Sequence, residues 1–197
     1  GRDRTEAAFP VFLLSLALVF ASVDVFAFLF AWEVMALSSA ALVFGARPDA
    51  AVARAGYFYL AVTHLATAAI VVAFAVLAAA AGASDFASLA ATTGTLPALG
   101  RDVVFVLLLV GFGTKAGAIP FHVWLPRAHP VAPSHVSALM SGVMIKAGIY
   151  GIVRFVLEIM GPGPEWWGIS VLAIGVVSAL LGVLYALMEH DLKRLLA

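Results

Sequence analysis

Three charged residues stand inside long apolar stretches of this sequence. Glu33 lies in FLFAWEVMALSSA, Lys115 in LLLVGFGTKAGAIP and Lys146 in SALMSGVMIKAGIYG. A charge at the centre of a membrane-spanning helix costs roughly 2.5–3.5 kcal/mol on insertion scales, so such residues usually face a polar pathway. The chemistry open to one carboxylate and two amines in such a place is proton transfer. A structural alternative is a single glutamate–lysine pair that locks two helices together, but it leaves one lysine over.

The histidines extend this set of titratable groups. His64 lies in the apolar stretch VTHLATAAI, and His122, His129 and His135 cluster in FHVWLPRAHPVAPSH. Histidine titrates near neutral pH, which suits a proton relay, although His64 could equally be a hydrogen-bonded packing residue. Spacings of seven and six residues match no common metal site, so we expect no metal ligand here. We place His129 near the membrane surface.

Prolines should break the helix that carries Lys115. Pro120 and Pro126 have no N–H group and disturb the carbonyl groups of residues 116 and 122. We therefore expect a kinked or non-helical segment near residues 117–121. Broken backbone at membrane depth is tolerated only where it is buried in protein or lines a wet cavity, and broken helices concentrate at ion sites of transporters. The prolines thus predict a protonatable amine beside a hydrated kink.

Membrane-spanning helices must position these residues. The chain has 197 residues, 64% of them hydrophobic and 11% charged, with a mean hydropathy of +1.10. Soluble domains have about a quarter charged residues, so we expect one all-α transmembrane domain over residues 1–197, a polytopic bundle of about six spans. The expected spans are 8–21, 25–44, 55–81, 102 into the proline-rich segment, 134–156 and 167–188. A polar loop should cover 82–100, and Asp24 should cap the second span.

The basic residues favour one orientation in the membrane. One side should carry Arg2, Arg4, Arg47, Arg54, Arg127, Lys193 and Arg194, and the other only Arg101 and Arg154. The positive-inside rule places the first side, with both chain ends, in the cytoplasm.

The formal net charge is zero, so we expect no nucleic-acid partner, and without cysteine the chain has no iron–sulfur or zinc-thiolate ligands. No nucleotide-binding or nucleophile motif is present.

The segment FGTKAGAIPFHVWLPRAHPVAPSHVSALMSGVMIKAGIYGIVRF resembles the core signature of a known membrane family. That family is the antiporter-like, proton-conducting subunits of respiratory complex I, Mrp sodium/proton antiporters and group 4 nickel–iron hydrogenases. FAWEVMALSSAALV is similar to its glutamate helix, and MEHDLKRLLA to the start of the helix after this repeat. Within this family, the sequences of these motifs are most similar to those of hydrogenase-4 component B and the large membrane subunit of formate hydrogenlyase.

The resemblance implies a larger inverted-repeat fold, of which this chain would be a fragment. The chain resembles helices four to nine and the start of helix ten of that fold. It implies that Glu33 is the glutamate of helix five, Lys115 the lysine of the broken helix seven and Lys146 the central relay lysine of helix eight. It also implies that Glu33 and Lys115 are partners, with Glu33 tuning the lysine.

The implied function is proton translocation by a non-redox subunit of a redox-driven complex, of the NADH:quinone oxidoreductase or group 4 hydrogenase type. No cofactor is expected in this chain, and nickel–iron and iron–sulfur centres are expected in partner subunits. The expected partners are the lipid bilayer, other membrane subunits, a peripheral redox arm, and protons or Na⁺. The expected location is the plasma (inner) membrane of a prokaryote. Alternatives are a Mrp-type Na⁺/H⁺ antiporter subunit and a structural anchor for a peripheral hydrogenase.

Overall fold

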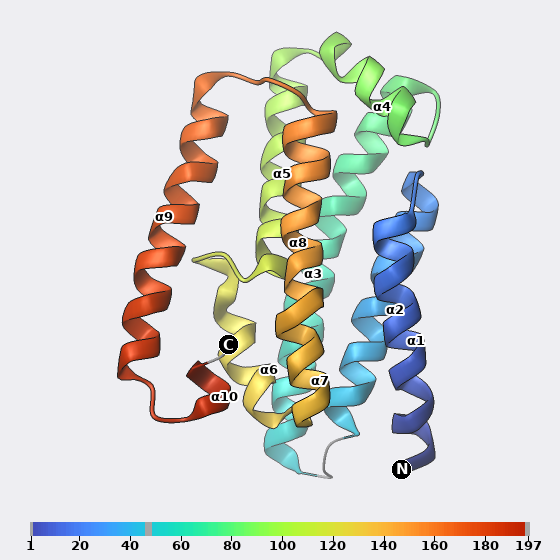
Figure 1. The fold of residues 1–197 in the computed structure, drawn as a ribbon. Helices are drawn as coiled ribbons and strands as arrows, with labels where there is room; N and C mark the ends of the chain where they lie inside the picture. Colours follow the sequence, from blue (N-terminus) through green and yellow to red (C-terminus); the bar gives the residue numbers. More distant parts are fainter. Residues whose placement is uncertain (1, 46–48, 196–197) are drawn as a thin grey trace.

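Long helices run alternately up and down in the computed structural model, which describes residues 2–45 and 49–195 (Figure 1). Five helical stretches among these residues are long and apolar enough to cross a membrane, and Ala7–Ala21 is a shorter apolar sixth. The expectation of an all-helical bundle of about six spans is therefore confirmed. The uninterrupted long helices are α1 (Arg2–Ala21), α2 (Val25–Phe44), α3 (Ala50–Ala81), α5 (Ala98–Ala116) and α9 (Glu165–Met188).

Aspartates at the N-caps decide where several helices begin. The Asp24 carboxylate accepts hydrogen bonds from the backbone N–H groups of Phe26 and Ala27 at 2.9 and 3.0 Å, so the predicted cap of α2 is confirmed. Asp49 accepts from the N–H of Ala51 at 2.9 Å in the same way. Because of this cap, α3 begins five residues before the expected start of its span.

The expected polar loop at 82–100 is partly helical. It contains α4 (Phe86–Thr92) and a 3₁₀ turn, Thr93–Thr95. Phe86 and Leu89 are three residues apart and buried, so the helix has an apolar face that the polar composition concealed. Hydrogen bonds from Ser88 hold the pKa of the capping residue Asp85 below its usual value.

The helix that carries Lys115 is interrupted, as predicted. α5 ends at Ala116, residues 117–120 are non-helical, and the chain continues as a 3₁₀ turn, Phe121–Trp124, and α6 (Leu125–Val131). Gly117 ends α5 in the left-handed region, with φ of 73°. Pro126 was expected to break the helix, but it lies in the first turn of α6, where a missing N–H costs nothing.

Lys146 lies in one continuous helical stretch, Ser134–Ile159, that changes its winding twice. α7 (Ser134–Leu139) passes into a π-helical segment, Met140–Met144, then α8 (Ile145–Gly151), then a second π-helical segment, Ile152–Ile159. Single π turns in otherwise regular helices are frequent at functional sites.

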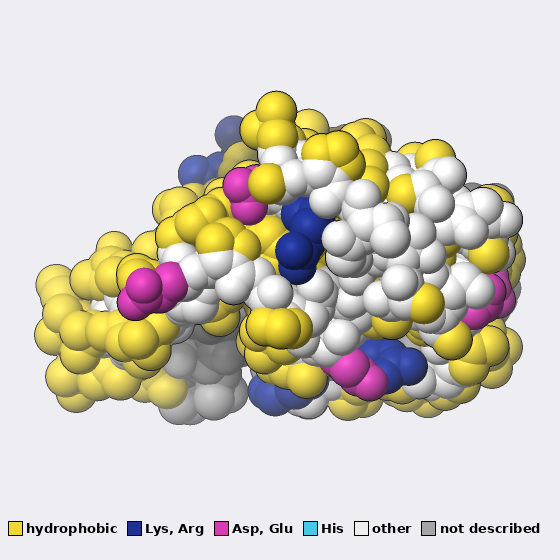
Figure 2. All heavy atoms as spheres, turned by 90° about the horizontal axis from the view of Figure 1, so that it is seen from above, with side chains coloured by type: hydrophobic (Ala, Val, Ile, Leu, Met, Phe, Trp, Pro, Cys, Tyr) yellow, Lys and Arg dark blue, Asp and Glu magenta, His cyan; other side chains and the backbone are white. Residues whose placement is uncertain are grey.

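The start of α1 and the short α10 (Leu192–Leu195) both lie toward the lower end of the bundle in Figure 1. The first turns of α3, with Arg54, and α6, with Arg127, lie toward the same end, whereas α5 begins with Arg101 near the other. Arg47 is outside the described residues. At the upper end, basic and acidic side chains are few and scattered among other atoms (Figure 2).

A glycine contact brings α5 and α8 together beside the helix break. A Cβ atom at Gly148 would meet the backbone nitrogen of Ala116 and would lie 2.8 Å from the carbonyl oxygen of Phe112. The two backbones therefore touch at a point next to Lys115 on one helix and two residues from Lys146 on the other. Any side chain here would push apart the helices that carry the two lysines.

We predict that Gly148→Ala destabilises the bundle by about 1–3 kcal/mol, because an added methyl group has no room against α5. The matched control is Gly142→Ala in the same helical stretch, where the new Cβ would meet nothing within 4 Å. Thermal unfolding of the purified protein in detergent measures the difference. Equal melting temperatures for the two variants would contradict the backbone contact.

Candidate functional site

Lys115 is almost completely buried, with 1% of its surface exposed. Its Nζ donates a hydrogen bond to the Tyr59 hydroxyl at 3.2 Å, and it lies 5.9 Å from the ring centre of Trp32 and 5.4 Å from that of Tyr59. Among the described residues no carboxylate forms an ion pair with it. The ammonium is thus held by a hydroxyl and two aromatic faces instead of a counter-ion.

Tyr59 continues the contacts of Lys115 toward α2. Its hydroxyl lies 2.7 Å from Ser39 Oγ, and Ser39 Oγ donates to the carbonyl of Ala36 at 2.8 Å. Since Ser39 has one hydroxyl proton and gives it to Ala36, Tyr59 must be the donor to Ser39. The bonds then run in one direction, from Lys115 to Tyr59 to Ser39 to the backbone. Sequence reasoning missed Tyr59 and Ser39, although Tyr59 lies five residues before His64 in the same apolar stretch.

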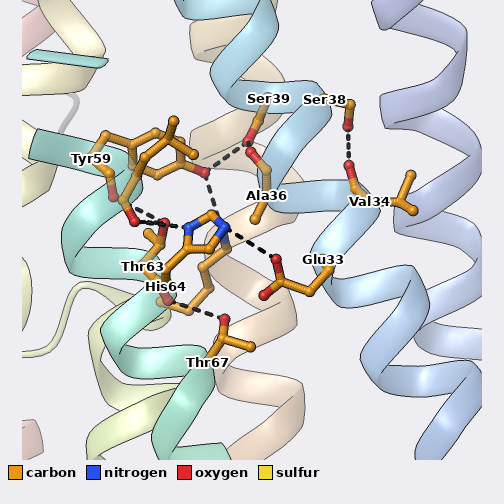
Figure 3. A network of polar contacts seen from close by, with 11 residues as sticks. Glu33, Val34, Ala36, Ser38, Ser39, Tyr59, Thr63, His64 and Thr67 are labelled. Carbon is orange, nitrogen blue, oxygen red and sulfur yellow. Dashed lines mark hydrogen bonds and ion pairs between the residues drawn. The ribbon is translucent and has the colours of Figure 1, made fainter. Parts of the chain in front are cut away.

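Glu33 pairs with His64 and not with Lys115, which corrects the expected partnership. Glu33 Oε2 lies 3.3 Å from His64 Nε2, and His64 Nδ1 lies 2.9 Å from the carbonyl of Leu60 (Figure 3). The carbonyl can only accept, so Nδ1 carries a proton. Nε2, the other ring nitrogen, faces the Glu33 carboxyl group. At this distance the two side chains are close enough to exchange a proton.

One short segment of α3, from Tyr59 to His64, contacts both Lys115 and Glu33. Tyr59 binds Lys115, and His64, five residues later, binds Glu33. Thr63, between them, donates to the carbonyls of Tyr59 and Leu60 at 2.9 and 3.2 Å, so the Leu60 carbonyl bonds both Thr63 and His64 (Figure 3). The side chains of Glu33 and His64 are 33% and 44% exposed, whereas Lys115 lies inside the bundle.

Backbone N–H and C=O groups at the break, which have no partner within the helix, form hydrogen bonds with side chains of neighbouring elements. Trp124 Nε1 donates to the carbonyl of Thr114 at 2.7 Å, and the N–H of Ile119 donates to Ser178 Oγ of α9 at 2.9 Å. A cavity of about 550 Å³ lies between the break and α9, with His122 and Tyr185 in its lining. The Nδ1 atom of His122 is buried there without a hydrogen-bond partner among the described residues.

Lys146 and His129 meet at one serine. Lys146 is exposed in this chain, and its Nζ donates to the carbonyl of Ser141 at 2.8 Å. His129 Nδ1 lies 3.1 Å from Ser137 Oγ and 3.3 Å from Ser141 Oγ. His129 was expected near the surface, but it is fully buried: its ring contacts Ser137 and Ser141 of the following helical stretch, and its Nε2 has no partner among the described residues.

The π-helical segment Met140–Met144 touches both groups of polar residues. Met144 Sδ lies 3.6 Å from the Tyr59 hydroxyl, and Ser141 contacts both Lys146 and His129. His135 takes no part in these contacts. It is exposed, and its ring packs edge-on against Phe9 at 5.4 Å. Within residues 2–45 and 49–195 no group of three His, Asp or Glu side chains could hold a metal ion.

Residues 22–197 match the family described as the transmembrane region of NADH:quinone oxidoreductase and Mrp antiporter subunits. The chain belongs to this family. The match spans far more than half of the chain, and it confirms the resemblance found in the motifs around Glu33, Lys115 and Lys146.

Known members of this antiporter-like family are similar over almost the whole chain. Hydrogenase-4 component B of Escherichia coli K12 is 48% identical over 189 residues, which are 95% of this chain and 28% of that protein. The Mrp complex of Dietzia sp. DQ12-45-1b superposes with a TM-score of 0.83 at 28% identity, over 94% of this chain and 20% of that chain.

The membrane-bound sulfane sulfur reductase, an archaeal respiratory membrane complex, superposes with a TM-score of 0.82 at 25% identity, over 95% of this chain and 39% of that chain. The chain spans less than a third of the length of the first curated relatives that it matches. The fold and the family are thus established for a chain that corresponds to part of the length of these relatives.

We predict that Trp124→Phe destabilises the break by about 1–3 kcal/mol, because the buried carbonyl of Thr114 loses its donor while the ring packing on Tyr59 is kept. Trp166→Phe is the control, since Trp166 is 40% exposed. The melting temperatures of the two purified variants test this. A Trp124→Phe protein as stable as the control would show that the indole N–H is dispensable.

Proposed function

We propose that this chain is part of a proton-translocating membrane subunit of a redox-driven complex of the hydrogenase-4 type. The observation that carries the proposal is the burial of Lys115 at the end of a broken helix, bonded to Tyr59 and with no carboxylate partner among the described residues. A lysine in this setting can be made to gain or lose its proton by small changes around it. A structural lysine would instead be expected in a closed ion pair.

The proton path that we propose has two parts. In the first, Lys115 holds a proton against Tyr59, and the Glu33–His64 pair holds another, five residues along α3. In the second, Lys146 binds the carbonyl of Ser141 and His129 contacts its hydroxyl, so a proton passes between them through a bridging water molecule. The direct contact between the parts runs through Met144, whose thioether transfers no proton. Passage therefore requires the Met140–Met144 segment to rearrange or a chain of water molecules to form beside it.

We further propose that the lower end of the bundle faces the cytoplasm of a prokaryote, because seven basic residues are assigned to that side and two to the other. The redox centres, nickel–iron and iron–sulfur, would then belong to a peripheral arm of other subunits, with no cofactor in this chain. The similarity to hydrogenase-4 component B supports this assignment.

A Na⁺/H⁺ antiporter subunit is the second candidate, because the chain superposes on a Mrp complex. The two functions separate in vesicles that contain the complete purified assembly. A redox-driven pump acidifies one side on addition of the electron donor and does not need Na⁺. An antiporter moves protons only in exchange for Na⁺, when a Na⁺ gradient is imposed. A structural anchor moves no protons under either condition.

We predict that Lys146→Ala abolishes proton translocation and that Lys146→Arg fails as well, because arginine cannot release its proton. General acid–base groups contribute about 100-fold or more to rates, so the loss should be at least that large. The control is Lys193→Arg, whose side chain binds the carbonyl of Ala132 through a simple hydrogen bond. Proton uptake is measured in vesicles, with assembly checked by quantifying the intact complex. Normal pumping by Lys146→Arg would reject the relay role.

We predict that Glu33→Gln lowers coupled translocation by about tenfold or more, since an amide keeps a hydrogen bond to His64 but cannot take up the shared proton. Because the two residues act as a unit, the double variant Glu33→Gln/His64→Gln should lose no more translocation than the more severe of the two single variants. Glu158→Gln, at an exposed pair with Arg154, is the control. Translocation per electron is the readout. If the fold-loss in the double variant equals the product of the fold-losses in the two single variants, the two residues do not share one proton.

A further inference from the structure

Two arginines at the lower end of the bundle flank a cavity that the proton path does not use. The cavity, of about 330 Å³, lies where α3 meets α6. Arg54 and Arg127 are both exposed, and among the described residues neither forms an ion pair. The cavity lining includes Ala51, Arg54, Phe58, Arg127, Pro130 and Val131.

The arrangement of these side chains is defined by one stacking contact. Arg54 and Phe58 are four residues apart on α3 and so share a face of the helix. The guanidinium carbon of Arg127 lies 4.1 Å from the centre of the Phe58 ring. Stacking on the ring occupies the flat face of the guanidinium and leaves its N–H edges available for a ligand.

The chemistry of the cavity fits a phosphate group attached to apolar chains. Planar guanidinium groups bind phosphate oxygens in a bidentate manner. No aspartate or glutamate is among the described residues that line the cavity. The lining therefore offers two arginines to the phosphate of a headgroup, but no carboxylate to the ammonium of a zwitterionic one. Phe58, Pro130 and Val131 offer an apolar wall.

We propose that this cavity binds the headgroup of an anionic phospholipid, with Arg54 and Arg127 on its phosphate oxygens. The start of α3 and α6, which line the site, lie toward one end of the membrane-spanning helices (Figure 1). Lipid headgroups lie at the level where membrane-spanning helices end. Basic cavities between helices at this level are suited to anionic lipids. The bound lipid joins α6 to α3 below the helix break, and so helps to hold the segment that follows Lys115.

The test uses the intact membrane protein in nanodiscs that contain a photoactivatable phosphatidylglycerol or the matching phosphatidylcholine. Crosslinks are mapped to peptides by mass spectrometry. We expect labelling of residues 51–58 and 126–131 by phosphatidylglycerol to exceed labelling by phosphatidylcholine. In Arg54→Gln/Arg127→Gln it should fall by about fivefold for each arginine lost. Arg154→Gln removes the same charge in the last part of the Ser134–Ile159 stretch, so it should leave this labelling unchanged.

Phe58→Leu keeps both charges but removes the stacking partner of Arg127, and it should weaken labelling less than the double change. This variant also tests the site if the double variant assembles poorly. Equal labelling by the two lipids, or unchanged labelling in both Phe58→Leu and the double variant, overturns the proposal. Loss of labelling in millimolar inorganic phosphate would show a free-phosphate site instead of a lipid site.

Discussion

The structure depends on how the buried amine of Lys115 is stabilised when none of the described carboxylates pairs with it. Lys115 lies in the last turn of α5, where the carbonyl groups of the helix carry partial negative charge. Ending the helix directly after Lys115 places that negative end inside the bundle, beside the ammonium. The Tyr59 hydroxyl and the aromatic faces of Trp32 and Tyr59 complete the environment. The helix break is thus part of the electrostatics of the site.

A helix that ends inside a membrane bundle needs partners for its backbone, and several neighbours meet that need. Gly117 takes the left-handed conformation that turns the chain, Trp124 binds the Thr114 carbonyl, and Ser178 binds the N–H of Ile119. Gly148 lets α8 approach the end of α5 without a side chain between them. The same packing brings Met144 to Tyr59, so the two halves of the proposed path touch where the break is closed.

Hydropathy and proline placement predict much of this fold because both act locally along the chain. The spans, the break after Lys115 and the Asp24 cap follow from residues within a few positions of each feature. The partner of Glu33 could not be predicted, because it depends on which faces of α2, α3 and α5 meet. His129 was placed at the surface for the same reason, since its burial results from how α6 packs against the α7 stretch. The helix α4 was missed because buried Phe86 and Leu89 stand among polar residues.

The pairing of Glu33 with His64 changes what the glutamate does for Lys115. A direct ion pair would hold the lysine proton tightly, whereas Glu33 is instead placed against His64, and no described carboxylate pairs with Lys115. In the proposed path, a change of one proton on the Glu33–His64 pair would change the local charge by one unit, five residues along α3 from Tyr59. At an effective dielectric near 20 such a charge acts on a lysine without touching it. The segment from Tyr59 to His64 thus holds Lys115 and Glu33 on separate partners, so that in the proposed path they act as two sites and do not form one salt bridge.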